Sequence, residues 1–99
     1  MPRMDAEHLS RVLSRIPGFS LLTPAERAEA ARIAQGFACK ESATDGKVSP
    51  ETIRARRKRI YRKLRLGGSG ELTALVLACS LELLAGRVRE SPPQLSAGP

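Results

Sequence analysis

Residues 49–65 read SPETIRARRKRIYRKLR, and this basic stretch sets the character of a chain whose net charge is +7. Eight of its last twelve residues are cationic: Arg54, Arg56, Arg57, Lys58, Arg59, Arg62, Lys63 and Arg65. No acidic residue occurs between Glu51 and Glu71. A solvated helical face normally mixes both signs of charge. The run therefore favours an anionic partner, with nucleic acid, an acidic membrane surface and an acidic protein as the candidates.

The same stretch has the apolar spacing of an amphipathic helix that runs from Ser49 to about Arg65. Ser49 is a suitable N-cap, and Pro50 suits the first helical position, where its missing N–H removes no hydrogen bond. One apolar stripe can seat the helix against a core, namely Ile53, Ile60 and Leu64. Arg57 lies near this stripe and is long enough to reach solvent. The opposite face is expected to present Arg54, Ala55, Lys58 and Arg62.

The outward face suits base reading in the major groove of DNA. The small Ala55 lets the backbone come close to base edges, and Arg54 and Lys58 on either side can donate to guanine acceptors. The flanking cations suit phosphate oxygens, and these are Arg56, Arg59, Lys63 and Arg65. A shorter helix over about 40–45 and a turn at Gly46-Lys47 come before it. Together they predict a helix-turn-helix layout.

Patterns in the rest of the chain predict further helices and an all-α fold. One helix is expected over about 5–16, with Asp5 as its N-cap. Its apolar stripe comprises Leu9, Val12, Leu13 and Ile16. A second helix starts with a capping box between Thr23 and Glu26, runs to about residue 35 and stops at Gly36. A last, leucine-rich helix is expected over about 71–86.

Composition limits the chain to one domain with a modest core. The 99 residues include only three aromatic side chains, so the core must come from Leu, Ile, Val and Ala. Cys39 and Cys79 form neither a disulfide framework nor a metal-binding pattern, and both are expected to be reduced. His8 is the only histidine and lies far in sequence from every candidate nucleophile. We therefore expect no enzyme activity, no cofactor and no metal.

Three segments are expected: an N-terminal amphipathic helix at 1–18, a helix-turn-helix domain at 19–87 and a disordered tail at 88–99. The first ten residues lack the apolar region of a signal peptide. The longest apolar stretch, Leu72 to Ala85, carries Glu82 and is too short to span a bilayer. These features predict a protein of the reducing cytoplasm, without a membrane partner.

Several ordered blocks of the sequence fall in register, without a gap, with a known type of domain. They are Leu22-Thr23-Pro24-Ala25-Glu26-Arg27, Ile33-Ala34-Gln35-Gly36, Lys40-Glu41, Val48-Ser49-Pro50-Glu51-Thr52-Ile53-Arg54 and Ile60-Tyr61-Arg62-Lys63-Leu64. Over about Leu21 to Leu84, the chain resembles the LuxR/GerE-type helix-turn-helix domain. The resemblance implies a four-helix domain whose third helix reads the major groove, here with an additional N-terminal helix.

The resemblance also implies partners and contact residues. It implies a stand-alone bacterial transcriptional regulator, associated with the nucleoid, that binds double-stranded DNA as a homodimer. By position, Arg54, Ala55 and Lys58 correspond to the base-reading surface and Thr52 to a phosphate contact. The expected DNA-binding residues are Thr52, Arg54, Ala55, Arg56, Lys58, Arg59, Arg62 and Lys63.

Dimers of this family often form through the fourth helix, which is the last helix here. The expected interface residues are Leu72, Leu75, Val76 and Leu81. Because this helix is apolar almost all round, burial within one chain is the alternative.

The scaffold departs from the family pattern in two helices. In the helix over about 24–35, Glu29 and Arg32 stand where aliphatic residues are usual, and Ala30 is smaller than usual. In the next helix, Ser42 and Gly46 replace Ile and Leu. Each lost aliphatic removes roughly 1–3 kcal/mol of burial. We expect the N-terminal helix and the last helix to supply the missing burial, within one chain or across a dimer.

Other functions stay open. The basic helix can bind RNA or another polyanion, or can be merely solvated. The thinned second helix of the domain motivates a protein-interaction module, one that uses the helix-turn-helix fold to bind another regulator or an RNA polymerase subunit. A polymerase-docking domain like region 4 of sigma factors shares the same motif, although the Leu22-to-Gln35 block and the long last helix fit it less well.

Overall fold

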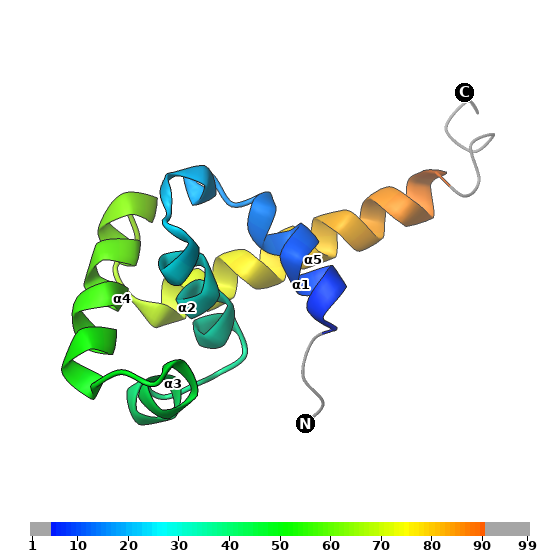
Figure 1. Ribbon diagram of the computed structural model, residues 1–99. Helices are drawn as coiled ribbons and strands as arrows, with labels where there is room; N and C mark the ends of the chain where they lie inside the picture. The colour runs from blue at the N-terminus through cyan, green and yellow to red at the C-terminus, as the bar shows by residue number, and fades with distance from the viewer. Residues whose placement is uncertain (1–4, 91–99) are drawn as a thin grey trace.

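The structure is a computed structural model that describes the backbone of residues 5–90 and the side chains of residues 5–86. Over this range the chain is all-helical, as expected, and contains no strand. The elements in chain order are α1 (Ala6–Ser14), the 3-10 helix η1 (Phe19–Leu21), α2 (Pro24–Ala34), α3 (Cys39–Gly46), α4 (Pro50–Leu64) and α5 (Ser69–Glu90) (Figure 1).

Side-chain caps start the helices where the sequence predicts them. Asp5 accepts hydrogen bonds from the first backbone amides of α1. At α2, the Glu26 amide donates to Thr23 Oγ1 at 3.1 Å, and the Thr23 amide donates back to Glu26 Oε1 at 2.9 Å. At α4, Ser49 Oγ accepts from the Thr52 amide at 3.1 Å. These bonds satisfy amides that a helix N-terminus otherwise leaves unpaired, which is why the starts are readable from local sequence.

The turn between α3 and α4 differs in detail from the expectation. Gly36 stops α2 at a φ of 88°, as predicted. Before α4, however, the left-handed residue is Lys47, at a φ of 57°, and Gly46 is the last residue of α3. A Cβ atom on Gly46 would lie 3.5 Å from the guanidinium nitrogens of Arg32. That distance is an ordinary van der Waals contact, so Gly46 lies beside the Arg32 side chain and does not form the turn.

Helix α1 is part of the core of the single chain. Three of its side chains, those of Leu9, Val12 and Leu13, are at most 5% exposed. Ile16, just after the helix, is 3% exposed. They pack in one cluster with residues of α2, α4 and α5. His8 Nε2 lies 2.8 Å from Ser80 Oγ and joins α1 to α5. His8 lies far in sequence from Ser80, but the two side chains are neighbours in the fold, and Ser80 is buried.

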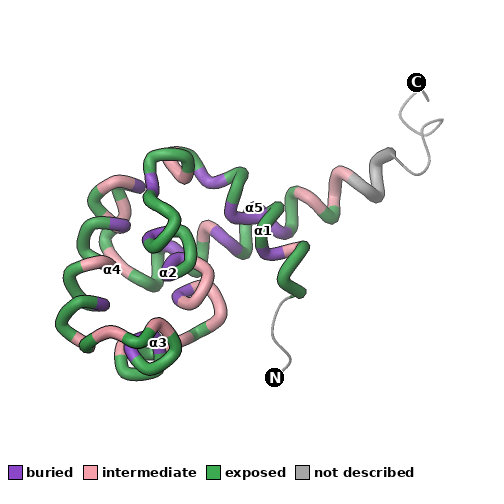
Figure 2. Tube along the Cα trace, in the orientation of Figure 1, coloured by how far each residue is buried: buried purple, intermediate pink, exposed green. Residues whose placement is uncertain are grey.

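Helix α5 is longer than expected at both ends. It begins at Ser69, so part of the expected glycine-rich connection is helical, and it continues to Glu90. The expected disordered tail at 88–99 stays a prediction: the helix includes the backbone of 88–90, and residues 91–99 lie outside the described part of the chain. The second half of α5 projects beyond the other helices (Figures 1 and 2).

The burial along α5 corrects the expected dimer interface. Leu72 and Val76 are buried in the core together with Cys79, so they are not available to a second chain. Leu75 is half-buried against the same core. Of the four expected interface residues, only Leu81 is exposed, at 57%. The alternative of burial within one chain is therefore correct for Leu72 and Val76.

One stretch of α5, Ser69–Gly86, has the length and mean hydropathy (1.4) of a membrane-spanning helix. The sequence predicts an apolar stretch, Leu72 to Ala85, that is too short to span a bilayer. The helix that forms is long enough, because its apolar part extends over Ser69–Gly86. Its buried side chains face α1 and α2 instead of standing free. Only 22% of this stretch is buried within the chain, so the other described helices leave most of it uncovered.

Candidate nucleic-acid interface

Helix α4 lies against α2 and α3 and turns one face outward. Ile53 and Ile60 are completely buried, and Leu64 is 8% exposed. Arg54, Ala55 and Lys58 are exposed. The arrangement that the sequence predicts for this helix, with three apolar anchors behind and three outward residues in front, is therefore confirmed.

The first turn of α4 holds its exposed side chains loosely. Thr52 Oγ1 lies 3.0 Å from Ser49 Oγ, within the cap. Arg54 Nη2 lies 3.2 Å from Glu51 Oε2, but both side chains are more than half exposed. An exposed pair of this kind is worth at most about 1 kcal/mol. Arg54 can therefore leave Glu51 for a stronger acceptor at little cost.

Further along α4, three cations have no acidic partner among the described side chains. They are Arg56, Lys58 and Arg62. Lys58 and Arg62 are exposed, and Arg56 is half-buried. With Arg54 they form the basic face of α4. Concentrated positive charge of this kind attracts phosphate oxygens.

Two of the residues expected to contact phosphate also pair with a carboxylate of the protein, although the Arg59 side chain stays 48% exposed and that of Lys63 33% exposed. Lys63 Nζ lies 2.7 Å from Glu26 Oε1, and Arg59 Nε lies 3.4 Å from Glu26 Oε2. The Glu26 side chain is 4% exposed. Lys63 and Arg59 therefore neutralise a buried carboxylate on α2 and fix the second half of α4 to it. Loss of Lys63, which the sequence predicts as a phosphate contact, would therefore also remove this contact with Glu26.

The same contacts lower the pKa of Glu26. Burial alone would raise the pKa, but the hydrogen bonds from Lys63 and the Thr23 amide, the charge of Lys63 and the hydrogen bond from Arg59 outweigh it and lower the pKa below its usual 4.5. The folded pKa then lies below the unfolded one. The stabilisation is therefore complete at neutral pH and is lost as the pH falls below the usual value.

Glu26→Gln is therefore expected to lower the free energy of unfolding at neutral pH and to make it less sensitive to acid. The measurement is the midpoint of urea unfolding between about pH 6 and about pH 3, where a depressed carboxylate pKa acts. Glu82→Gln is the matched control, because Glu82 is exposed on α5. Equal loss of stability on acidification in the Glu26 variant and the control would contradict the assignment.

The Arg57 side chain is long enough to reach solvent, but in the fold it points inward. Its side chain is 11% exposed, and its Nε donates to Glu29 Oε2 at 2.8 Å. Its Nη2 donates to the Phe37 carbonyl at 2.7 Å and to Ser42 Oγ at 3.0 Å. One guanidinium group thus joins α4 to α2, to the α2–α3 connection and to α3. This network positions the basic helix but takes no part in its outward face.

The second carboxylate oxygen of Glu29 extends the network to α3. Arg32 Nη1 lies 3.0 Å from Glu29 Oε1, and Arg32 Nε lies 2.7 Å from Asp45 Oδ2. Burial would lower the pKa of Arg32, but the hydrogen bonds to Asp45 and Glu29 raise it overall, so the guanidinium stays charged. Glu29 itself has no exposed surface, and within residues 5–86 no buried polar side-chain atom lacks a partner.

These contacts explain the departures in the scaffold, which the sequence presented only as lost aliphatics. Glu29, Arg32, Ser42 and Gly46 lie together: Arg32 donates to Glu29, Ser42 Oγ accepts from Arg57, and Gly46 lies beside the Arg32 guanidinium. The sequence could have indicated these ion pairs, because the charge of Glu29 is opposite to those of Arg32 and Arg57 and all three occupy positions that face the core. The scaffold is therefore not thin but is filled by polar groups.

The chain was compared with family models, with curated proteins and with solved structures. No family model matches it, no curated protein matches it, and no solved structure matches it.

Proposed function

We propose that the chain binds double-stranded DNA and regulates transcription, with α4 in the major groove. The supporting observation is the seating of α4: Ile53 and Ile60 anchor it while the basic face and Ala55 stay accessible. Helix α3, the turn at 47–49 and α4 have the order of a helix-turn-helix motif. A buried network holds α4 at a fixed angle, which base reading requires.

The order of α2 to α5 agrees with the four-helix domain that the LuxR/GerE resemblance implies, and α1 is then the addition. On this proposal, Arg54, Ala55 and Lys58 face base edges, while Thr52, Arg56 and Arg62 contact phosphates. Arg59 and Lys63 also pair with Glu26 and so tie α4 to α2. The protein would work as a cytoplasmic bacterial regulator without a cofactor, and its activity would be binding, not catalysis.

A second copy of the chain fits the far part of α5. Leu77, Leu81 and Leu84 recur at i, i+4 and i+7 and are 60%, 57% and 47% exposed. A stripe of this kind on a projecting helix is stabilised by an equivalent stripe. Pairing there replaces the expected interface through Leu72 and Val76. A dimer would place two copies of α4 on half-sites about one helical turn apart.

The test begins with selection of duplexes from a randomised library, followed by affinity measurements at several salt concentrations. A selected duplex is expected to contain two inverted half-sites and to bind with an affinity that falls steeply with salt. Arg54→Ala or Lys58→Ala should cost about 1–3 kcal/mol on the selected duplex and relax specificity at one position. Arg62→Ala should weaken selected and random duplexes alike.

Arg15→Ala is the matched control, since Arg15 is exposed at the end of α1 and removal of its charge leaves α4 intact. If Arg54→Ala and Lys58→Ala behave like this control on every duplex, the assignment of base-reading residues is wrong. The protein-interaction module stays the rival function. Its motivation was the thinned second helix, which the Arg57 network now fills. Binding of a polymerase subunit or regulator that survives both α4 variants would favour it.

A further inference from the structure

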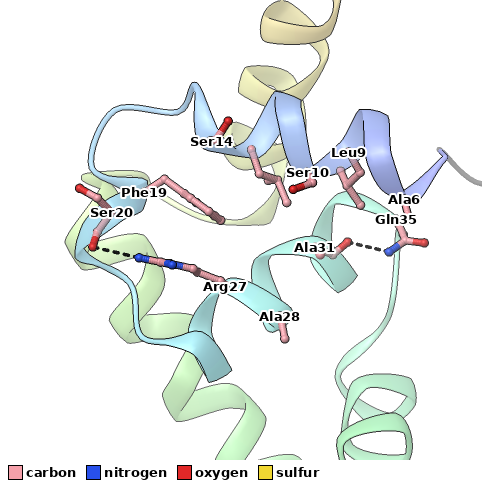
Figure 3. A pocket seen from close by; sticks show the side chains of 11 residues that line it. Ala6, Leu9, Ser10, Ser14, Phe19, Ser20, Arg27, Ala28, Ala31 and Gln35 are labelled. Atoms are coloured by element: carbon pink, nitrogen blue, oxygen red, sulfur yellow. Dashed lines mark hydrogen bonds between the residues drawn. The ribbon is translucent and has the colours of Figure 1, made fainter.

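A groove of about 680 Å³ lies between α1, η1 and α2 (Figure 3). Its volume is within the range of small-molecule sites. The residues that line it lie on α1, η1 and α2 and at the C-terminal end of α2. None of them belongs to α3 or α4, so the groove is separate from the candidate nucleic-acid interface.

The wall of the groove is mostly apolar and carries one charge. Leu9 and Leu13 from α1, Phe19 from η1 and Ala31 from α2 supply the apolar surface. The charge is the guanidinium of Arg27, whose Cζ lies 5.6 Å from the centre of the Phe19 ring. Figure 3 shows Arg27 extending below the ring toward Ser20, and Gln35 at the other end of the groove.

Arg27 has donors to spare. Its Nη2 donates to the Ser20 carbonyl at 3.3 Å, which is a long hydrogen bond. Among the described side chains no carboxylate pairs with it. A guanidinium offers five N–H donors in a planar fork that matches a carboxylate. The cation is also held in place by the aromatic ring, so it loses little freedom on binding.

We propose that this groove binds a small amphipathic monocarboxylate, with the carboxylate on Arg27 and the apolar body between α1 and α2. The charge at one end selects an anion, and the apolar wall selects a hydrocarbon or aromatic body over a compact polar anion. The ligand contacts both helices. Binding therefore stabilises the packed position of α1, because a ligand that binds only the folded state stabilises that state, and more so as the free ligand concentration rises above Kd.

Octanoate is the probe, and octanamide is its neutral counterpart of the same length. Amide chemical shifts of the ¹⁵N-labelled protein are followed while each probe is added. Octanoate is expected to shift the resonances of α1, η1 and α2 residues that line the groove, to saturate, and to raise the melting temperature. Shifts spread over the basic face of α4, or no saturation at millimolar octanoate, would overturn the proposal.

Two variants test the roles of charge and space. Arg27→Gln should weaken octanoate binding about three- to tenfold and leave octanamide binding unchanged. Arg15→Gln removes an exposed arginine outside the groove and should change neither. Ala28→Leu fills the groove from the exposed side of α2 and should abolish binding while helical content is kept. Equal octanoate affinity in the Arg27 and Arg15 variants, or in the Ala28 variant and the original protein, overturns the assignment.

Discussion

Deletion of residues 1–18 is expected to abolish cooperative thermal unfolding of the remaining chain. Four side chains of this segment are almost completely buried, namely Leu9, Val12, Leu13 and Ile16. Burial of each is worth about 1.5–3 kcal/mol, against a total stability of about 5–15 kcal/mol for a small domain. The deletion also uncovers the side of α5 that carries Val76 and Cys79. Differential scanning calorimetry or the near-ultraviolet signal on heating provides the measurement.

A single substitution tests the same dependence without truncation. Ile16→Ala should lower the free energy of unfolding by about 2–5 kcal/mol, because Ile16 is 3% exposed and its neighbours cannot fill the space fully. For a domain of this size the melting temperature should fall by roughly 10 °C or more. Arg15→Ala, at the adjacent exposed position, should change stability by less than about 0.5 kcal/mol. If the truncated chain melts cooperatively near the temperature of the whole, α1 does not complete the core.

The parts of the fold that the sequence predicts are those that local physics determines. The capping side chains at Asp5, Thr23 and Ser49 act within three residues of themselves, so they mark helix starts wherever the chain packs. The outward face of α4 was predictable for a similar reason. The spacing of Ile53 and Ile60 identifies the buried side, and the opposite side follows from helical geometry.

The parts that sequence reasoning missed depend on pairing across the fold. The sequence cannot show that Leu72 is buried and Leu77 exposed, because α5 is apolar on every side and the buried side depends on where α1 and α2 pack against it. Lys63 has the same charge whether it faces a phosphate or a buried carboxylate, and only the position of Glu26 on α2 decides. Glu29 was noticed as a departure, but its partners lie on α2 and α4.

Glu29→Gln is expected to lower the free energy of unfolding by about 3–5 kcal/mol. Glu29 has no exposed surface and lies between two guanidinium groups, at 2.8 Å from Arg57 and 3.0 Å from Arg32. The glutamine keeps the shape but removes the charge. Two largely buried cations would then lose their shared counter-ion, and the low dielectric of the interior makes that costly. Chemical unfolding at neutral pH gives the magnitude.

The chain offers a closely matched control in Glu51→Gln. Glu51 also pairs with an arginine three residues along the same helix, at 3.2 Å from Arg54, but that pair is exposed. Its loss should cost at most about 1 kcal/mol, because solvent screens the interaction. The contrast between two identical substitutions isolates the effect of burial. Equal costs for the two variants would mean that Glu29 is not enclosed by its partners.

A combined apolar variant tests whether the network stabilises the fold or only specifies it. Replacement of an entire buried ion network by well-packed apolar residues is often neutral or stabilising by about 1–4 kcal/mol, whereas removal of one partner is not. The substitutions replace each residue of the group around Glu29 by an aliphatic residue: Glu29→Val, Arg32→Leu, Ser42→Ile, Gly46→Leu and Arg57→Leu. We expect this variant to be at least as stable as the original protein, and to recover the stability that Glu29→Gln alone loses. If instead it unfolds more readily than Glu29→Gln, the hydrogen bonds of Arg57 to Phe37 and Ser42 stabilise the contact between α3 and α4 beyond what apolar packing supplies.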